Sequence, residues 1–122
     1  MFIYCVTVSF TNKIGKGDLM NTVMICSATI ATVFGQPIEI MTTEPQSDNP
    51  EIYVVTYKRP DDGTVWVNKC KVEGDRVIWG AIDGRWRTHN LDSKITFSES
   101  KTHVTITEVY SDGSATTKQY PK

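Results

Sequence analysis

Short runs rich in Val, Ile, Thr, Tyr and Trp, separated by turn residues, occupy the chain from Gln36 to its end. Runs of this composition favour β-strands, and the close spacing of the turns leaves no room for crossover helices. The pattern therefore predicts an antiparallel all-β domain over residues 36–122, a small up-and-down barrel (a meander) or a strongly curved sheet. The eight predicted strands are Ile38–Thr43, Glu51–Arg59, Thr64–Val72, Arg76–Ile82, Arg85–His89, Lys94–Ser98, His103–Tyr110 and Ser114–Tyr120.

The turn signals also predict which residues face one another across neighbouring strands. We expect a four-residue loop at residues 60–63 and two-residue loops at residues 74–75 and 83–84, the last of which is Asp-Gly, the strongest short hairpin signal. Because side chains alternate between the two faces of a strand, each loop length sets the face of every residue on both of its strands. The expected pairs are Tyr57 with Trp66, Cys70 with Trp79, Glu73 with Arg76, and Ala81 with Trp86.

This register separates the aromatic residues from the basic ones. The three tryptophans, Trp66, Trp79 and Trp86, fall on the face that carries Cys70, and we expect them to be buried there and near one another. The opposite face collects basic side chains and is the candidate binding surface for an anionic partner. Its residues are Lys69, Lys71, Arg85, Arg87 and His89. Because no aromatic ring is expected beside them, single-stranded nucleic acid is a disfavoured partner.

An uncharged run between Leu19 and Ile38 is open to two interpretations. In the first, residues 1–35 are a secretory signal peptide, because two lysines precede the apolar run and Gly35 offers a small residue before a cut at Gln36. The mature protein, residues 36–122, is then periplasmic or secreted and has no membrane span.

In the second interpretation residues 1–35 stay in place as a strand, residues 2–8, and a buried helix. Asp18 is then the N-cap and Gly35 the residue that ends the helix. A helix without charges has to be covered on every face, which is demanding for a small sheet domain. The fold in this case is α+β, with one N-terminal helix packed on the sheet, and the location is cytoplasmic. Met20 is an alternative start of the chain.

The composition argues against several classes of function. The chain has 122 residues, the length of one domain, and a net charge of −1, which argues against a globally basic nucleic-acid binder. Its three cysteines are an odd number and do not indicate a disulfide framework, so we expect Cys70 to act as a small buried hydrophobic residue. The two histidines lack the spacing of metal ligands, and no catalytic motif or cofactor-binding loop is present. We therefore expect no catalytic residue, no metal and no cofactor.

These expectations define two candidate functions. The first is a small non-enzymatic binding or inhibitor protein, exported from the cell, that recognises a protein or another anionic partner through a face of its sheet. In its expected shape such a protein resembles the small periplasmic barrels that inhibit lysozymes, although the chain carries no motif of that family. The second is an intracellular accessory module, of the kind phages and plasmids encode, that binds protein or nucleic acid through the local basic face.

Overall fold

The computed structural model describes residues 16–122, and within that range the chain forms one α-helix, one short 3₁₀ turn and seven strands. The helix α1 spans Lys16–Phe34, and the turn η1 spans Ile38–Ile40. The strands are β1 (Thr42–Pro45), β2 (Tyr53–Lys58), β3 (Val65–Glu73), β4 (Arg76–Ala81), β5 (Lys94–Glu99), β6 (His103–Val109) and β7 (Ala115–Pro121). The strand expected at residues 2–8 lies outside the described residues.

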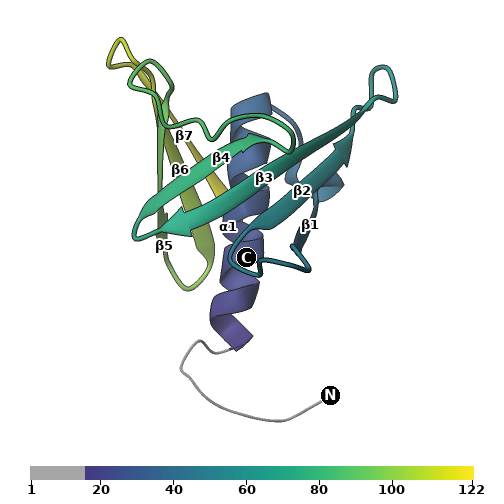
Figure 1. The fold of residues 1–122 in the computed structure, drawn as a ribbon. Helices are drawn as coiled ribbons and strands as arrows, with labels where there is room; N and C mark the ends of the chain where they lie inside the picture. The colour runs from purple at the N-terminus through teal and green to yellow at the C-terminus, as the bar shows by residue number, and fades with distance from the viewer. Residues whose placement is uncertain (1–15) are drawn as a thin grey trace.

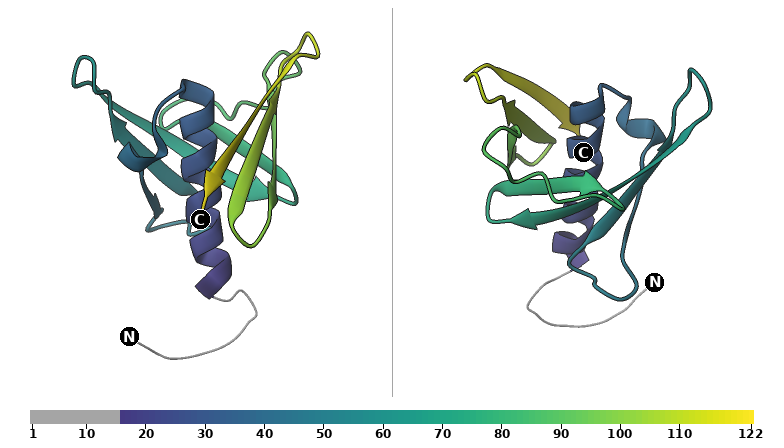
Figure 2. Two further views of the ribbon diagram at one scale, coloured as in Figure 1. Left: turned by 180° about the vertical axis from the view of Figure 1, so that it is seen from behind. Right: turned by 45° about the horizontal axis from the view of Figure 1, so that its top comes forward.

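The strands form one antiparallel sheet in the order of the chain, β1 to β7. Figures 1 and 2 show that the sheet curls into a half-barrel, with α1 lying along its concave side. The prediction of a strongly curved antiparallel sheet is therefore confirmed, and so is the alternative in which one N-terminal helix packs on it. The expected strand at Ile38–Thr43 is shorter than predicted, because the chain makes the turn η1 before β1 begins at Thr42.

The register of the central strands follows the loop lengths that the sequence predicts. Across β2 and β3 Tyr57 lies opposite Trp66. Across β3 and β4 Cys70 lies opposite Trp79, and the same hairpin places Glu73 opposite Arg76. The last pair flanks Gly74, whose φ of 62° is a left-handed conformation that suits a tight turn. Local turn chemistry was sufficient to set these three pairs.

The helix is buried along its middle two turns, where every residue from Ile25 to Thr32 is buried. Its hydroxyl groups are satisfied inside the helix: Thr29 Oγ1 donates to the carbonyl oxygen of Ile25 and Thr32 Oγ1 to that of Ala28, both at 2.8 Å. Buried polar groups need such partners, and these bonds make a threonine-rich helix compatible with a core. The curled sheet therefore provides the covering that the uncharged part of this helix requires.

Both edges of the half-barrel are joined to this helix. The hydroxyl groups of Ser27 and Thr43 on β1 lie 2.6 Å apart, and those of Thr32 and Tyr120 on β7 lie 2.8 Å apart. These two hydrogen bonds hold the first and the last strand against α1, on either side of the open part of the barrel.

The helix ends as the sequence predicts. Gly35 follows Phe34 with φ of 64°, and the backbone N–H of Gln36 donates to the carbonyl oxygen of Ala31 at 3.0 Å. This is the Schellman arrangement, in which a left-handed glycine stops a helix and satisfies one of its last carbonyl groups. The start of the helix differs from the prediction, because α1 begins at Lys16, two residues before the expected cap Asp18.

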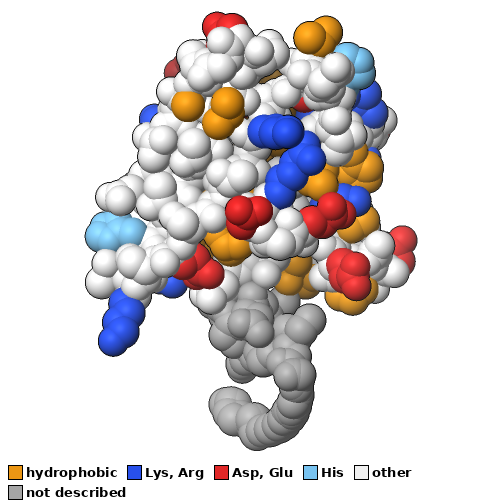
Figure 3. All heavy atoms as spheres, turned by 90° about the vertical axis from the view of Figure 1, so that its left-hand side faces the viewer, with side chains coloured by type: hydrophobic (Ala, Val, Ile, Leu, Met, Phe, Trp, Pro, Cys, Tyr) orange, Lys and Arg blue, Asp and Glu red, His pale blue; other side chains and the backbone are white. Residues whose placement is uncertain are grey.

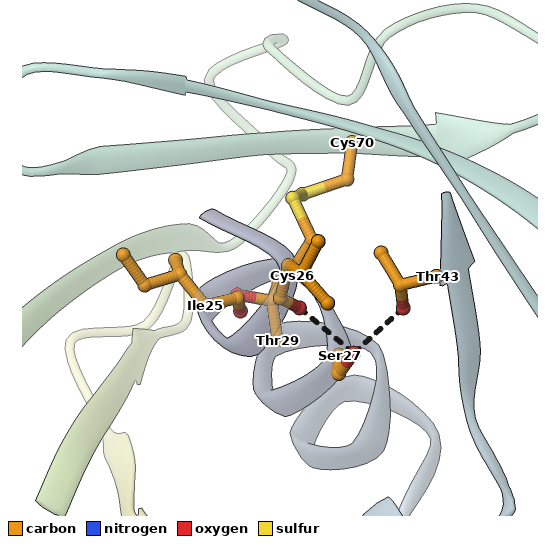
Figure 4. The surroundings of a disulfide bond; sticks show 7 residues. Ile25, Cys26, Ser27, Thr29, Thr43 and Cys70 are labelled. Atoms are coloured by element: carbon orange, nitrogen blue, oxygen red, sulfur yellow. Dashed lines mark hydrogen bonds between the residues drawn. A yellow bond between two sulfur atoms is a disulfide. The ribbon is translucent and has the colours of Figure 1, made fainter. Parts of the chain in front are cut away.

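A disulfide bond between Cys26 and Cys70 joins the helix to the centre of the sheet. Figure 4 shows the bond crossing from α1 to β3, and both residues are 0% exposed. The expectation that Cys70 is simply a small buried hydrophobic residue is therefore wrong. The sequence argument failed because the pairing depends on the helix lying under β3, and an odd cysteine count does not reveal which two cysteines meet. The third, Cys5, lies outside the described residues.

One predicted strand is absent. Residues 85–89 form no strand, because the turn after β4 closes one residue earlier than expected, with the Gly84 N–H donating to the Ala81 carbonyl oxygen at 3.0 Å. A two-residue hairpin of the Asp-Gly type requires a positive φ at its glycine, and Gly84 does not adopt one. The chain from 82 to 93 is instead an irregular segment, called here the β4–β5 loop.

Candidate functional site

The β4–β5 loop turns back along the edge of β4. Within the described residues β5 pairs with β4 only at Arg76 and Val77, so the remaining edge of β4 is open to other partners. The Arg87 N–H uses that edge and donates to the Trp79 carbonyl oxygen at 2.8 Å. Gly80 permits the approach, since a Cβ at this position would overlap the carbonyl oxygen of Arg85. The loop is thus seated on β4 without forming a strand.

Lys69 and Lys71 lie on the outer face of β3, as the sequence predicts, but Trp86 lies there with them. Their ammonium nitrogens are 4.6 and 4.5 Å from the centre of the Trp86 ring, and Lys69 Nζ also donates to the Gly84 carbonyl oxygen at 2.6 Å. The prediction that Trp86 belongs to the core face is wrong, because it rested on the hairpin that does not form. The ring is already occupied by two cations, so it is not a free stacking platform for a base.

Arg85 and Arg87 meet at one carboxylate, that of Asp92. Arg85 binds both oxygens of Asp92, at 2.7 and 3.1 Å, and Arg87 lies 3.6 Å from one of them. These contacts, first of all the hydrogen bond from Arg85, lower the pKa of Asp92 to about 2. The same hydrogen bond raises the pKa of Arg85. Asp92 therefore stays ionised and offsets part of the positive charge that the sequence places here.

His89 is exposed and belongs to the same loop. Its backbone N–H donates to Asp92 at 3.0 Å, and its ring Nδ1 accepts a hydrogen bond from the Leu91 N–H at 3.1 Å. Nδ1 is therefore the acceptor nitrogen of the neutral ring, which places the ring proton on Nε2.

The five predicted binding residues are thus near one another in the chain's fold but do not share one sheet face. Lys69 and Lys71 lie on the outer face, and Lys71 is 3.5 Å from its own acidic partner, Glu73. The guanidinium of Arg87 instead lies 5.1 Å from the centre of the Trp79 ring, which faces the core.

An aromatic cluster lies at the C-terminal end of α1, and the sequence predicted three of its rings, those of Tyr57, Trp66 and Trp79, but not Phe34. Phe34 contacts three rings, with centroid distances of 5.9 Å to Tyr57, 5.6 Å to Trp66 and 5.4 Å to Trp79. Tyr57 and Trp66 also stack, with 6.5 Å between centroids. Burial raises the pKa of Tyr57, an effect that the nearby charge of Arg59 opposes. Phe34 comes from the helix, so strand pairing gives no signal for its part in this cluster.

Two arginines flank these rings. The Arg59 guanidinium lies 5.8 Å from the centre of the Trp66 ring, and Arg87 lies over Trp79 as described above. Trp79 is buried as predicted, at 9% exposed, whereas Trp66 is 38% exposed and the prediction that it is largely buried is wrong. We call the six residues Phe34, Tyr57, Trp66, Trp79, Arg59 and Arg87 the rim cluster.

The rim cluster offers aromatic rings and guanidinium groups to a partner. Cys70 is held in the disulfide and is buried, so its sulfur is not a free thiol. Within residues 16–122 no group of three or more His, Cys, Asp or Glu side chains is placed to hold a metal ion. In the same range no helix has the length and apolar character needed to span a membrane.

Comparisons of the chain with protein families, with curated proteins and with solved structures found no match. The residues and their geometry therefore carry the functional argument.

Proposed function

We propose that this protein is a non-enzymatic binding protein that uses the rim cluster to recognise an acidic segment of a partner protein. The observation that carries the proposal is the exposed Trp66 ring, held between Phe34 and Tyr57 and flanked by Arg59. Trp, Tyr and Arg are the residue types that dominate binding energy in protein interfaces, especially where they are rigidly packed. A tryptophan whose neighbours fix its ring loses little conformational entropy when a partner covers it.

Charge supports an acidic partner. Arg59 lies 3.9 Å from each of its nearest carboxylates, those of Asp61 and Asp62, which is beyond hydrogen-bond distance. Its Nε is buried and has no hydrogen-bond partner. A partner carboxylate that reaches this guanidinium gains a charge-assisted hydrogen bond that the protein itself does not satisfy. A neutral segment offers this guanidinium only uncharged acceptors, and a basic segment is repelled by its charge.

The disulfide bond supports export. Structural disulfides persist in the periplasm and outside the cell and are rare in the cytosol. Because Cys26 lies in α1, this proposal keeps the helix in the working protein. Cleavage before Gln36 stays an untested prediction, and it would remove one of the two bonded cysteines together with the helix that fills the core.

The experiment is an array of defined acidic, neutral and basic peptides probed with the purified, oxidised protein. We expect binding to acidic peptides that weakens as salt rises, since exposed charges are screened over about 8–10 Å near physiological ionic strength. Trp66→Ala and Arg59→Glu should each weaken that binding about tenfold or more. Lys118→Glu is the matched control, since Lys118 is an exposed strand residue away from the rim cluster and its replacement should leave binding unchanged.

Two outcomes contradict the proposal. The first is that the Trp66→Ala and Arg59→Glu variants bind acidic peptides as tightly as the native protein does. The second is preferential binding of a single-stranded oligonucleotide, which would instead support the basic residues around Trp86 as a nucleic-acid site.

A further inference from the structure

A pocket of about 310 Å³ lies between the β4–β5 loop and the neighbouring ends of β4, β5 and β6, separate from the rings of the rim cluster. Arg76 on β4 and Lys94 on β5 line it from the sheet, and residues 88–90 line it from the loop. Figure 3 looks onto the side of the molecule that carries β5 and β6. In its upper half Lys and Arg side chains lie beside one another, with a histidine at the upper right.

The pocket has an excess of positive charge. Within the described residues neither Arg76 nor Lys94 has a carboxylate within ion-pair distance, and Glu73, which lies opposite Arg76 in the register, pairs with Lys71. The one carboxylate in the lining is that of Asp92, which Arg85 already binds through both oxygens. Arg76 and Lys94 therefore line the pocket without an ion-pair partner among the described residues.

The pocket also has hydrogen-bond donors that bind no other described residue. The Nε of Arg76 is buried and has no partner, which is an unfavourable state for a charged donor. Among residues 16–122 the side chains of Thr88, Asn90 and Ser111, all in the lining, form no hydrogen bond. Exposed hydroxyl and amide donors beside two cations that have no ion-pair partner in this range are the features of a site for an oxygen-rich anion.

We propose that this pocket binds the tetrahedral oxyanion of a small phosphorylated or sulfated molecule. Arginine presents a planar set of donors that matches the oxygens of such an anion, and lysine adds a compact positive charge. Ligand pockets span about 300–1,000 Å³, so this one is at the small end and suits one anionic group with a small substituent. The larger hollow beside β1, of about 540 Å³, is lined by Glu44 and Asp48 and by no cation, which makes it unsuitable for the same ligand.

The test is a nuclear magnetic resonance titration of the full oxidised protein with inorganic phosphate, inorganic sulfate and acetate at constant ionic strength. We expect phosphate or sulfate to shift the Arg76 Nε–H and the Asn90 amide signals in a saturable way, and acetate to shift them far less. Glucose 6-phosphate and glucose 6-sulfate then distinguish the two sources of the anion. Arg76→Gln and Lys94→Gln should each weaken binding about tenfold or more, which is the loss of one charged hydrogen bond. Lys118→Gln should leave it unchanged.

Shifts that do not saturate, or shifts that acetate reproduces, would overturn the proposal. So would Arg76→Gln and Lys94→Gln variants that bind phosphate or sulfate as tightly as the native protein does. If Arg76→Gln does not fold, the Lys94→Gln variant alone tests the proposal, since Lys94 is exposed and its replacement leaves the core intact. Trp66→Ala and Arg59→Glu, which test the rim cluster, should not change oxyanion binding. Oxyanion binding at the pocket and acidic-peptide binding at the rim cluster can therefore be refuted independently of each other.

Discussion

Reduction of the disulfide between Cys26 and Cys70 should lower the free energy of unfolding by about 4 kcal/mol. The two cysteines are 44 residues apart. In the chain-entropy description a closed loop of that length lies between the 15-residue case, about 3 kcal/mol, and the 100-residue case, about 4.7 kcal/mol. Small domains have a total stability of about 5–15 kcal/mol, so this bond accounts for a large share of it.

The assay is urea unfolding of the oxidised and the reduced protein, followed by tryptophan fluorescence. A Cys5→Ser background prevents exchange with the third cysteine. The unfolding slope should rise on reduction, because an uncrosslinked unfolded chain exposes more surface. A double variant, Cys26→Ala with Cys70→Ala, is the control, and its midpoint should not respond to reductant. A free energy of unfolding that falls by less than about 1 kcal/mol on reduction would refute this reasoning.

Three further predictions concern the loop and the core. Gly80→Ala should destabilise the fold by about 1–3 kcal/mol in urea melts, because the added Cβ has no space under the β4–β5 loop. Gly84→Ala is the control, and its stability should be nearly unchanged because its Cβ meets only ordinary contacts. In the same measurement Trp79→Ala should lower the free energy of unfolding by about 3–5 kcal/mol. Trp66→Ala should lower it clearly less, since the Trp66 ring is partly exposed. Equal losses in the two variants would contradict the burial described. Because the pKa of Asp92 is lowered to about 2, its contribution to stability should be full above about pH 4–5 and should fade as the pH drops toward 2. Thermal melts of Asp92→Asn should therefore differ from those of the native protein near neutral pH and converge with them at the acid end.

The central sheet could be predicted because its loops are short and their chemistry is local. The turn at Gly74 sets Glu73 opposite Arg76, and every pair further along both strands follows from it. The prediction failed at Asp83-Gly84, where the turn closes one residue earlier and the returning chain passes close to Gly80. The face that side-chain alternation predicted for Trp86 was therefore wrong.

The site was less predictable than the sheet, because its decisive contacts join segments that are distant in the sequence. Lys69 and Lys71 could be placed on the outer face by alternation alone. The rim cluster needs Phe34 at the end of the helix to meet Trp66 more than 30 residues later. Nothing in the local pattern of either segment indicates that contact, and the same is true of Cys26 and Cys70.

The burial of α1 under strands that follow it in the sequence has a consequence for the order in which the chain can be made. The ribosome releases the helix before β1 to β7, the strands that cover it in the described residues, and Cys26 waits for Cys70 through 44 further residues. At about 5–20 residues per second this interval lasts about 2–9 seconds. During that time the nascent chain presents an apolar, uncharged segment with no sheet to bury it, and chaperones or a translocation channel can hold it only while the sheet is incomplete. Formation of the half-barrel therefore ends the period in which this protein can be passed unfolded from one cellular machine to another.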